Sequence, residues 1–414
     1  MTAHTASIPL VSTIFIVTYL ALALGRIPGL RIDRAGIALV GAAAMLACGV
    51  LSMREAAKAV DYETLVLLFG MMVVVGYLRL AGFFSLATEW IAGRFSGPFS
   101  LLAVTIALSG GLSAFLVNDV VCVALTPLVL HLCQRLKRPP IPYLVGLATA
   151  SNVGSVATIT GNPQNIIIGS LSQISYLRFA TRLAPVALIG LVINFAIVAL
   201  VYRTVLREGG PAAREDEDTP QIRIFRPLLI KSIAVTAITV GLFFAGQPIA
   251  LVALVAAGVL MLDRIRPDRV YRSIDWPLLV MFAGLFVVVR AFEVTVVHTW
   301  RLEEWRVLLD SPVVMLSGLS VVLSNLVSNV PAVLLFKPLM EVMPQKELAW
   351  LALSMSSTLA GNLTILGSVA NLIVVENARR AGTELGFAEY LKVGVPLTAL
   401  TTVVGIAWLL LVHY

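Results

Sequence analysis

Two polar stretches interrupt apolar parts of the chain, and their residue types could hold a small solute or an ion. They are residues 151–165, SNVGSVATITGNPQN, and residues 357–371, STLAGNLTILGSVAN. Gly and Pro release backbone groups from helical hydrogen bonds, and Asn, Ser and Thr side chains supply donors and acceptors. Freed carbonyls could coordinate a cation or solute hydroxyl groups, and freed helix N-termini could hold an anion or a polarised oxygen.

Two shorter motifs, VNDV at 117–120 and SNVP at 328–331, add further polar groups inside apolar segments. Asp119 in the first motif is the most informative single residue. A carboxylate within a membrane is costly and by default suggests an ion or proton site. The alternative is a carboxylate that is permanently paired with a helix N-terminus or an arginine.

The composition explains where these motifs must lie. The chain has 414 residues, of which 59% are hydrophobic and 13% charged, with a mean hydropathy of +0.94. A soluble domain carries roughly 25% charged residues. Apolar runs long enough to span the bilayer recur along the whole chain, and they predict an all-α polytopic membrane protein. The apolar runs are 8–24, 36–52, 64–82, 182–202, 228–245, 248–262, 276–296 and 393–412.

The net charge of +7 is explained by cytoplasmic loops rather than by nucleic-acid binding. Basic residues are concentrated in loops on the cytoplasmic side of membrane proteins. With the N-terminus outside, 18 of the 30 Lys and Arg residues fall in inside segments and 7 in outside segments. The distribution therefore predicts that both termini lie outside. Arg290 and Glu293 are interpreted as residues that snorkel from a helix end, and Lys337 as one that snorkels from a hairpin arm. Glu376 and Arg379 are interpreted as a helix-end ion pair.

The chain contains an internal repeat in three gapless blocks. Residues 61–75 align with 275–289, 109–128 with 320–339, and 151–168 with 357–374. The third block matches Ser, Thr, Gly and Asn, which are costly or disruptive in a lipid-facing helix. The repeat partner of Asp119 is Val330, so the carboxylate is asymmetric.

Each half then has about five transmembrane helices and one re-entrant hairpin, and the odd number of crossings inverts the second half. Inverted repeats with broken helices near the midplane are typical of secondary transporters. The predicted boundaries are a first repeat at 1–204 with its hairpin at about 98–136 and its broken helix at about 142–169, a charged cytoplasmic linker at 205–226, and a second repeat at 227–414 with its hairpin at about 311–345 and its broken helix at about 347–375.

We expect the hairpin tips and broken helices to meet in one polar site for binding and coupling. The alternative is that small and polar residues only hold helices together, but this does not explain the same polar set at matched spacing in both halves. The expected site residues are Asn118, Asp119, Ser151, Asn152, Thr158, Gly161, Asn162, Asn165, Ser328, Asn329, Ser357, Thr358, Asn362, Thr364, Gly367, Ser368 and Asn371.

The sequence gives little support for an enzyme or for a metal site. Cys48, Cys122 and Cys133 have no zinc-ligand spacing, and the four histidines are scattered. No Gly-x-Ser-x-Gly, His-Glu-x-x-His or phosphate-loop motif is present. We therefore expect no catalytic residues, no metal site and no cofactor. An ion channel remains an alternative of another class, although a hairpin pair within an inverted repeat argues against it.

The four polar motifs resemble those of the ion transporter superfamily over nearly the whole chain. The Asn118–Asp119 tip and the Asn329–Val330–Pro331 tip are similar to the branch of ArsB-type arsenite permeases and related citrate-transporter-like anion permeases. Sodium symporters of the same superfamily carry Ser-Asn-Thr at both tips. The departure from that pattern puts a sodium site in doubt and favours proton coupling through Asp119.

The resemblance implies an elevator-type homodimer in a prokaryotic inner membrane, in which the hairpins and broken helices move against a scaffold that includes 8–82 and 228–296. It implies proton-driven export of arsenite or antimonite, because neutral As(OH)₃ needs no arginine clamp. A sodium- or proton-coupled carrier of di- or tricarboxylates or of another inorganic anion is the alternative. The resemblance also allows association with a cytoplasmic ATPase subunit, with lipids and the solute as the other partners.

Overall fold

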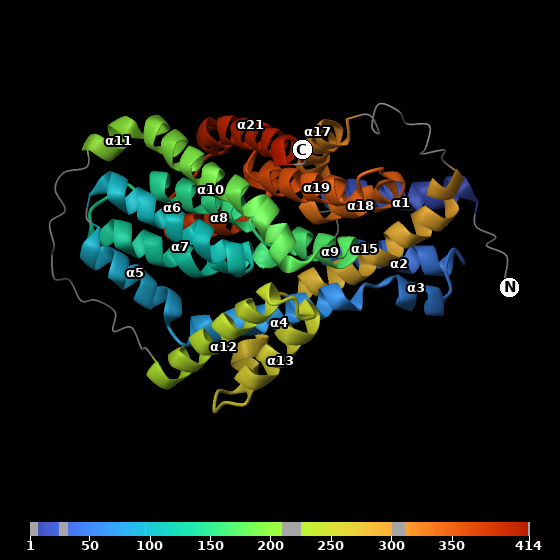
Figure 1. The fold of residues 1–414 in the computed structure, drawn as a ribbon, viewed down its shortest axis with the longest axis horizontal. Coiled ribbons are helices and arrows are strands. Elements are labelled where there is room, and N and C mark those ends of the chain that lie inside the picture. The colour runs from blue at the N-terminus through green and yellow to red at the C-terminus, as the bar shows by residue number, and fades with distance from the viewer. Residues whose placement is uncertain (1–6, 25–31, 96, 209–224, 300–310, 413–414) are drawn as a thin grey trace.

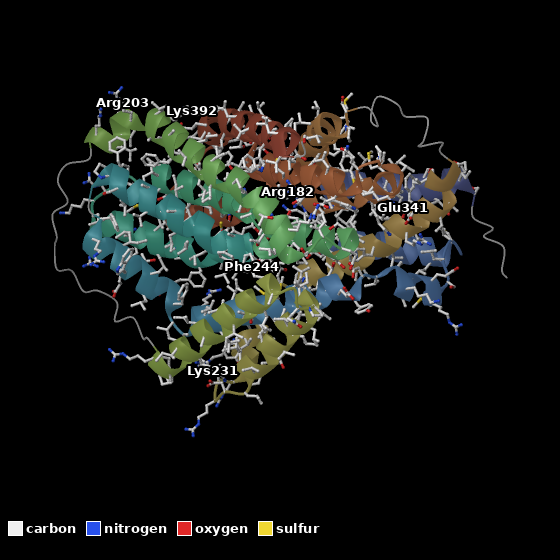
Figure 2. All side chains as sticks on the ribbon, in the orientation of Figure 1. Arg182, Arg203, Lys231, Phe244, Glu341 and Lys392 are labelled. Atoms are coloured by element: carbon white, nitrogen blue, oxygen red, sulfur yellow. The ribbon has the colours of Figure 1, made fainter. Side chains whose placement is uncertain are left out.

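All regular secondary structure in the described part of the chain is helical (Figure 1). The computed structural model describes residues 7–24, 32–95, 97–208, 225–299 and 311–412. Within these residues, six helices are long and apolar enough to cross a membrane, and four shorter helices are also apolar. Figure 2 shows that the charged side chain of Arg203 points outward at the margin of the molecule. This is the arrangement of an all-helical polytopic membrane protein.

Among the described residues the two halves share one order of elements, except that η2 stands where the first half has α5 and that α11 has no counterpart. The first half contains α1 (Ile8–Leu24), α2 (Arg34–Ala47), α3 (Met53–Ala59), α4 (Tyr62–Leu80), α5 (Phe83–Arg94), α6 (Pro98–Phe115), α7 (Asn118–Arg135), α8 (Ile141–Ser155), η1 (Ile159–Gly161), α9 (Pro163–Ser172), α10 (Tyr176–Val201) and α11 (Arg203–Glu208). The second half contains α12 (Arg226–Phe244), α13 (Ile249–Met261), α14 (Pro267–Tyr271), α15 (Trp276–Thr295), η2 (Val297–Thr299), α17 (Pro312–Val327), α18 (Asn329–Val342), α19 (Lys346–Ala360), η4 (Ile365–Gly367), α20 (Val369–Arg380) and α21 (Phe387–Val412).

Two equivalent helix pairs, α2 with α15 and α4 with α13, pack closely and contain the matched glycines Gly70 and Gly284. A Cβ on Gly70 would lie 2.7 Å from the backbone carbonyl carbon of Ala253, and one on Gly284 would lie 2.8 Å from that of Ala38. Both distances are too short for a side chain, so glycine is required for each close approach. The repeated Asp61 and Asp275 begin their helices as N-caps, because each side chain accepts backbone N–H groups of the first turn.

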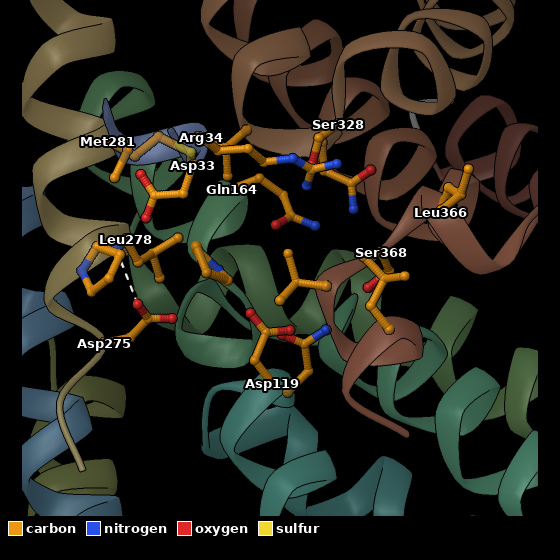
Figure 3. A pocket seen from close by; sticks show the side chains of 18 of the residues that line it. Asp33, Arg34, Asp119, Gln164, Asp275, Leu278, Met281, Ser328, Leu366 and Ser368 are labelled. Carbon is orange, nitrogen blue, oxygen red and sulfur yellow. Dashed lines mark hydrogen bonds between the residues drawn. The ribbon is translucent and has the colours of Figure 1, made fainter. Parts of the chain in front are cut away.

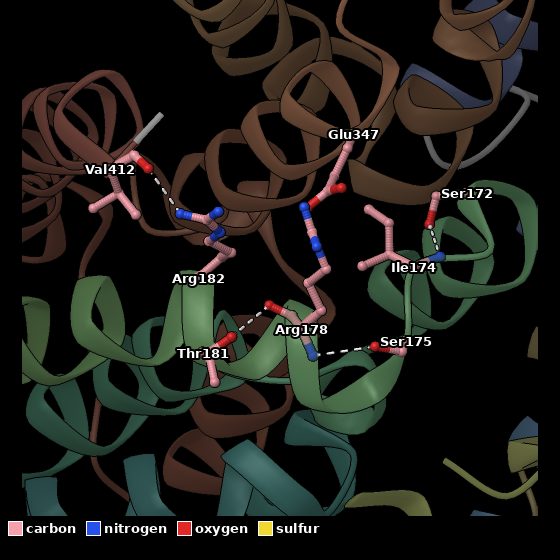
Figure 4. Close-up of polar contacts among 8 residues, drawn as sticks. All are labelled: Ser172, Ile174, Ser175, Arg178, Thr181, Arg182, Glu347 and Val412. Carbon is pink, nitrogen blue, oxygen red and sulfur yellow. Dashed lines mark hydrogen bonds and ion pairs between the residues drawn. The ribbon is translucent and has the colours of Figure 1, made fainter. Parts of the chain in front are cut away.

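The two hairpins, α6–α7 and α17–α18, each pack against the broken helix of their own half. They also reach the other half, because α7 contacts α20 and α18 contacts α9. The second tip turns at Ser328, which has a φ of 76°. Figure 4 shows a further link between the halves, in which Arg178 Nε and Glu347 Oε1 lie 2.5 Å apart at the starts of α10 and α19.

Most predicted elements are present, with differences at their edges. The structure has helix pairs at α6–α7 and α17–α18 and interrupted helices at α8–α9 and α19–α20. The division into two inverted repeats with re-entrant hairpins stays a prediction. Helix α5 was not foreseen, and α2 begins two residues early and ends at Ala47 rather than near 52. The predicted linker begins within α11, which continues to Glu208. The remaining linker residues at 209–224 lie outside the described residues.

Candidate functional site

The two broken helices have the same local backbone. In the first half α8 ends at Ser155, and α9 restarts at Pro163 after the short helix η1. Thr158 and Asn162 on either side of η1 are extended, and so are Thr364 and Ser368 on either side of η4. The side chains of Asn162 and Ser368 accept backbone N–H groups of the restarted helices and act as N-caps.

Asn165 and Asn371 close the two breaks with matching hydrogen bonds. Asn165 Nδ2 donates to the carbonyls of Ser155 (3.0 Å) and Thr158 (3.1 Å). Asn371 Nδ2 donates to the carbonyls at the corresponding repeat positions, Gly361 (2.7 Å) and Thr364 (3.1 Å). These carbonyls therefore have hydrogen-bond donors within the protein. The matched asparagines stabilise the two helix breaks, whereas the sequence analysis expected them to line the binding site.

Asn152 joins the first hairpin tip to both broken helices. Its Oδ1 accepts from Asn118 Nδ2 (3.0 Å) and from Ser368 Oγ (3.0 Å). Its Nδ2 donates to Oδ1 of Asn362 (2.9 Å) and of Asn371 (3.1 Å). A buried network of this kind is stable only when its members are satisfied, so these segments hold one another in place.

A second group of contacts forms around Thr358, the repeat counterpart of Asn152. Thr358 Oγ1 accepts from Asn162 Nδ2 (3.1 Å) and donates to Asn165 Oδ1 (3.2 Å). In the amide orientation that satisfies its neighbours, Asn329 donates to the carbonyls of Ser357 and Gly367, at 3.2 Å each, and accepts from Gln164 Nε2 at 3.3 Å. Thus the second hairpin tip also contacts both halves.

The remaining expected residues lie behind this network. The hydroxyl groups of Ser151 and Ser357 donate to carbonyls within their own helices. Thr158 donates to the carbonyl of Ala114, and Thr364 donates to Asn325 Oδ1 at 3.2 Å. Gly161 approaches the Ser155 backbone, where a Cβ would lie 2.2 Å from the carbonyl oxygen, and Gly367 lies close to Asn325. These residues support the site through contacts with the surrounding protein.

A cavity of about 500 Å³ lies next to the network (Figure 3). Five of the residues expected from the sequence line it: Asn118, Asp119, Ser328, Asn329 and Ser368. The opposite wall comes from the starts of α2 and α15 and includes Asp33, Arg34 and Asp275, which the sequence analysis did not include. The sequence alignment pairs Asp275 with Asp61, and both residues cap helices. This shared role does not indicate that Asp275 borders a cavity.

Hydrogen-bond acceptors dominate the polar lining of the cavity. Asp119 lies close to the backbone of Ala370 at the start of α20, and the N–H of Ala370 donates to Ser368 Oγ at 3.2 Å. Asn118 is 3% exposed, and its Oδ1 is buried without a hydrogen-bond partner among the described residues. An unpaired buried acceptor is unfavourable, so this face of the cavity suits a ligand that donates hydrogen bonds.

The contact between α15 and α18 corrects the snorkelling interpretation of three residues. Glu293 Oε2 lies 3.2 Å from Arg290 Nη1 and 3.6 Å from Lys337 Nζ. The Lys337 ammonium therefore extends towards a carboxylate on another helix, and the charges form a local triad. The Glu376 interpretation is confirmed, since this side chain pairs with Arg379 and also with Arg380, both at 3.0 Å.

No group of three His, Cys, Asp or Glu side chains that could hold a metal ion occurs among the described residues. Cys122 is free and buried, and its Sγ lies 3.1 Å from Ser151 Oγ. The described cysteines thus take part in packing and local hydrogen bonding.

Known proteins resemble this chain over nearly its full length. The silicon efflux transporter LSI3 of Oryza sativa subsp. japonica is 33% identical over 97% of this chain and 98% of its own. A Dictyostelium discoideum relative that carries the name arsB is 25% identical over 92% of this chain and 88% of its own. The crystal structure of the Alcanivorax borkumensis YdaH transporter has a similar fold, with a TM-score of 0.60, 18% identity and 97% of each chain covered.

The family assignment agrees with these similarities. The sequence profile of the family described as citrate transporter matches residues 15–358, which is more than half of the chain. A transporter of this family moves a small solute and is not an enzyme. The protein therefore belongs to the citrate transporter family of the ion transporter superfamily.

Proposed function

We propose that the protein exports arsenite or antimonite by proton antiport. The observation that carries this proposal is the convergence of both hairpin tips and both broken helices on one acceptor-rich cavity that contains Asp119. The hydroxyl groups of As(OH)₃ would donate to Asn118 Oδ1 and to the Asp119 carboxylate. No lysine or arginine of the hairpins or broken helices lines the cavity, among the described residues.

The names of two relatives agree with this class of solute. One relative is named arsB, and another is named as a silicon efflux transporter. Arsenous and silicic acids are both small hydroxylated acids that are uncharged near neutral pH. A site built from hydrogen-bond acceptors would recognise their shared O–H groups, so silicic acid is a further member of the proposed class.

The movement that we propose is an elevator. The transport domain comprises α6–α9 and α17–α20, and the scaffold comprises α1–α4 and α12–α15. The two halves are inverted in the membrane, both termini lie outside, and the protein works as a homodimer in a prokaryotic plasma membrane. In this orientation the starts of α2 and α15 face the cytoplasm, so the cavity opens inward.

Asp119 is the proposed coupling group. It would take a proton from the outside, carry it inward and release it as the solute binds from the cytoplasm. The loaded transport domain would then return outward. Because one carboxylate serves both the proton and the solute, the two bind in alternation.

Arsenite resistance and vesicle transport test the proposal. Expression in arsenite-sensitive cells should raise the tolerated arsenite concentration. Everted membrane vesicles should accumulate arsenite saturably when their interior is acidic, and a protonophore should abolish the accumulation. Arsenite that only equilibrates across the membrane, at a rate that does not respond to the proton gradient, would instead identify a channel. Cells that gain no tolerance, together with vesicles that do not respond to the gradient, would refute the proposal.

One observation favours a second candidate, a coupled carrier of di- or tricarboxylates. The Arg34 guanidinium lines the cavity, and the matching family is described as citrate transporter. A guanidinium suits a carboxylate through two parallel hydrogen bonds. Citrate or succinate uptake that is driven by sodium or protons, in vesicles that do not transport arsenite, would establish this second function.

A further inference from the structure

Arg34 brings a positive charge to a cavity that otherwise contains carboxylates. It is the first residue of α2, directly after the N-cap Asp33. Figure 3 shows its side chain extending over the cavity in the direction of Ser328 at the second hairpin tip. The other charged residues that line the described cavity are Asp33, Asp119 and Asp275. Arg34 therefore supplies the guanidinium donors of this site.

The local structure does not explain why an arginine occupies this position. A positive charge at a helix N-terminus opposes the helix dipole. The nearest scaffold carboxylates serve as caps, since Asp33 Oδ1 accepts from Gly36 N (2.8 Å) and Asp275 Oδ1 accepts from Leu278 N (3.0 Å). Within the described ranges, no ion pair joins half-buried Arg34 to a carboxylate. A residue that is unfavourable locally and borders a ligand cavity indicates a functional role.

We propose that Arg34 recognises the oxygen atoms of the solute on the side to which the cavity opens, and only on that side. This inference rests on the proposed division into scaffold and transport domain. A guanidinium has five N–H donors and accepts nothing. Solute oxygens would accept from Arg34 while solute O–H groups donate to Asn118 and Asp119. The bound solute then bridges the scaffold and the transport domain.

The corresponding hollow in the other pair of scaffold helices supports this sidedness. It has a volume of about 590 Å³ and lies at the starts of α4 and α13, together with α9 and α10. The first residue of α13 is Ile249, where α2 has Arg34. Glu63 is the charged residue that lines this hollow, and its described lining contains no lysine or arginine. A solute that moves to this side therefore loses its hydrogen bonds to the Arg34 guanidinium.

The position of Arg34 on the scaffold has a measurable consequence. A transport-domain residue such as Asn118 travels with the solute and influences binding on both sides. Arg34 strengthens binding on the cytoplasmic side alone, so uptake from the cytoplasm is favoured and release outside is easier. Hydrogen bonds to charged groups are worth roughly 10- to 100-fold in affinity, and this is the expected size of the sided effect.

Transport kinetics from each side test the role of Arg34. Initial rates are measured in everted and right-side-out vesicles against both arsenite and citrate, for the wild type, Arg34→Gln and Arg34→Lys. Arg290→Gln is the control, because Arg290 also lies in the scaffold but does not line the cavity. We expect Arg34→Gln to raise KM at least about tenfold in everted vesicles, without a fall in kcat there, and to leave the right-side-out KM unchanged. Arg34→Lys should retain part of the affinity, and the control should match the wild type.

The possible results separate the two proposals. An unchanged KM in everted vesicles, or an equal rise in both preparations, would overturn the sided role of Arg34. An unchanged right-side-out KM also shows that Arg34→Gln is folded. Wild-type transport of citrate but not arsenite overturns the proposed substrate, while the citrate data still decide the role of Arg34. A wild type that transports neither probe overturns both proposals.

Discussion

The broken helices of the two halves match closely, whereas the hairpins that meet them do not. Asn165 and Asn371 donate to carbonyls at equivalent positions of their own breaks. In contrast, the first hairpin tip carries Asp119 where the second carries Val330. The second hairpin arm carries Lys337, which pairs with scaffold Glu293, where the first arm has Thr126. The residues that match between the halves thus stabilise the helix breaks, and the residues that differ between the hairpins carry the charges.

The largest expected effect concerns the unmatched carboxylate. Asp119→Asn should reduce proton-driven arsenite accumulation to background, because the amide cannot exchange a proton, while arsenite exchange without a gradient should continue. Both are measured in everted vesicles. Full accumulation by this variant would remove Asp119 from the coupling role.

The same variant can be used to test whether the two hairpin tips are equivalent. Val330→Asp in the Asp119→Asn background places the carboxylate at the matched position, near the start of α9 rather than α20. We expect part of the gradient-driven transport to return. A double variant that stays inactive would show that the equivalence of the halves is limited to their backbone.

The matched asparagines should be costly to replace, and by similar amounts. Asn165→Leu or Asn371→Leu leaves two buried carbonyls without their donors, at roughly 1–3 kcal/mol each, so unfolding free energy should fall by roughly 2–6 kcal/mol in either half. Denaturant unfolding of the purified protein in detergent measures the loss. Asn377→Leu on α20 is the control, since its side chain makes no hydrogen bond with the described residues. A large loss in one half only would contradict the structural equivalence.

The matched glycines test the scaffold in the same way. Gly70→Ala and Gly284→Ala each place a methyl group against a backbone in α13 or α2. Overpacking of this kind costs roughly 1–3 kcal/mol, which should appear as lower thermal stability in both variants. Gly258→Ala on α13 has open space around its Cβ and should be neutral or stabilising. Equal stability of all three variants would mean that the close packing of these helices does not require glycine.

The smallest expected effect concerns the unmatched ion pair. Glu293 and Lys337 are 13% and 30% exposed, and a partly exposed pair contributes roughly 0.2–1 kcal/mol. Lys337→Glu should therefore shift the conformational equilibrium up to about fivefold, and adding Glu293→Lys should reverse the shift. The labelling rate of Ser368→Cys by a membrane-impermeant thiol reagent, in a Cys48→Ser background, reports the open cavity. Arg290→Gln removes the partner of Glu293 on α15 but keeps the contact between the two helices, so it should change the rate less than Lys337→Glu.

The sequence was most informative where polar residues recur at fixed spacing in apolar surroundings. Asn118, Asn152 and Asn329 could be placed in one site because lipid-facing helices do not tolerate such groups. The two hairpins followed from the same argument. The scaffold wall of the cavity could not be predicted, because Arg34 and Asp275 lie at ordinary helix starts and reach the site only through tertiary packing. The Lys337 pairing was missed for the same reason, since its partner Glu293 lies on a different helix, outside the aligned blocks of the repeat.

The hydrogen bonds of Asn152 also have a consequence for how the protein is made. Its partners Asn362 and Asn371 follow it by 210 and 219 residues, so they are synthesised long after the first half has entered the membrane. Until then the Asn152 amide lacks these acceptors in a nonpolar medium, where an unsatisfied polar group is costly. We therefore expect the first half to stay at the insertion machinery, or to keep water in its interior, until the ribosome has made the second.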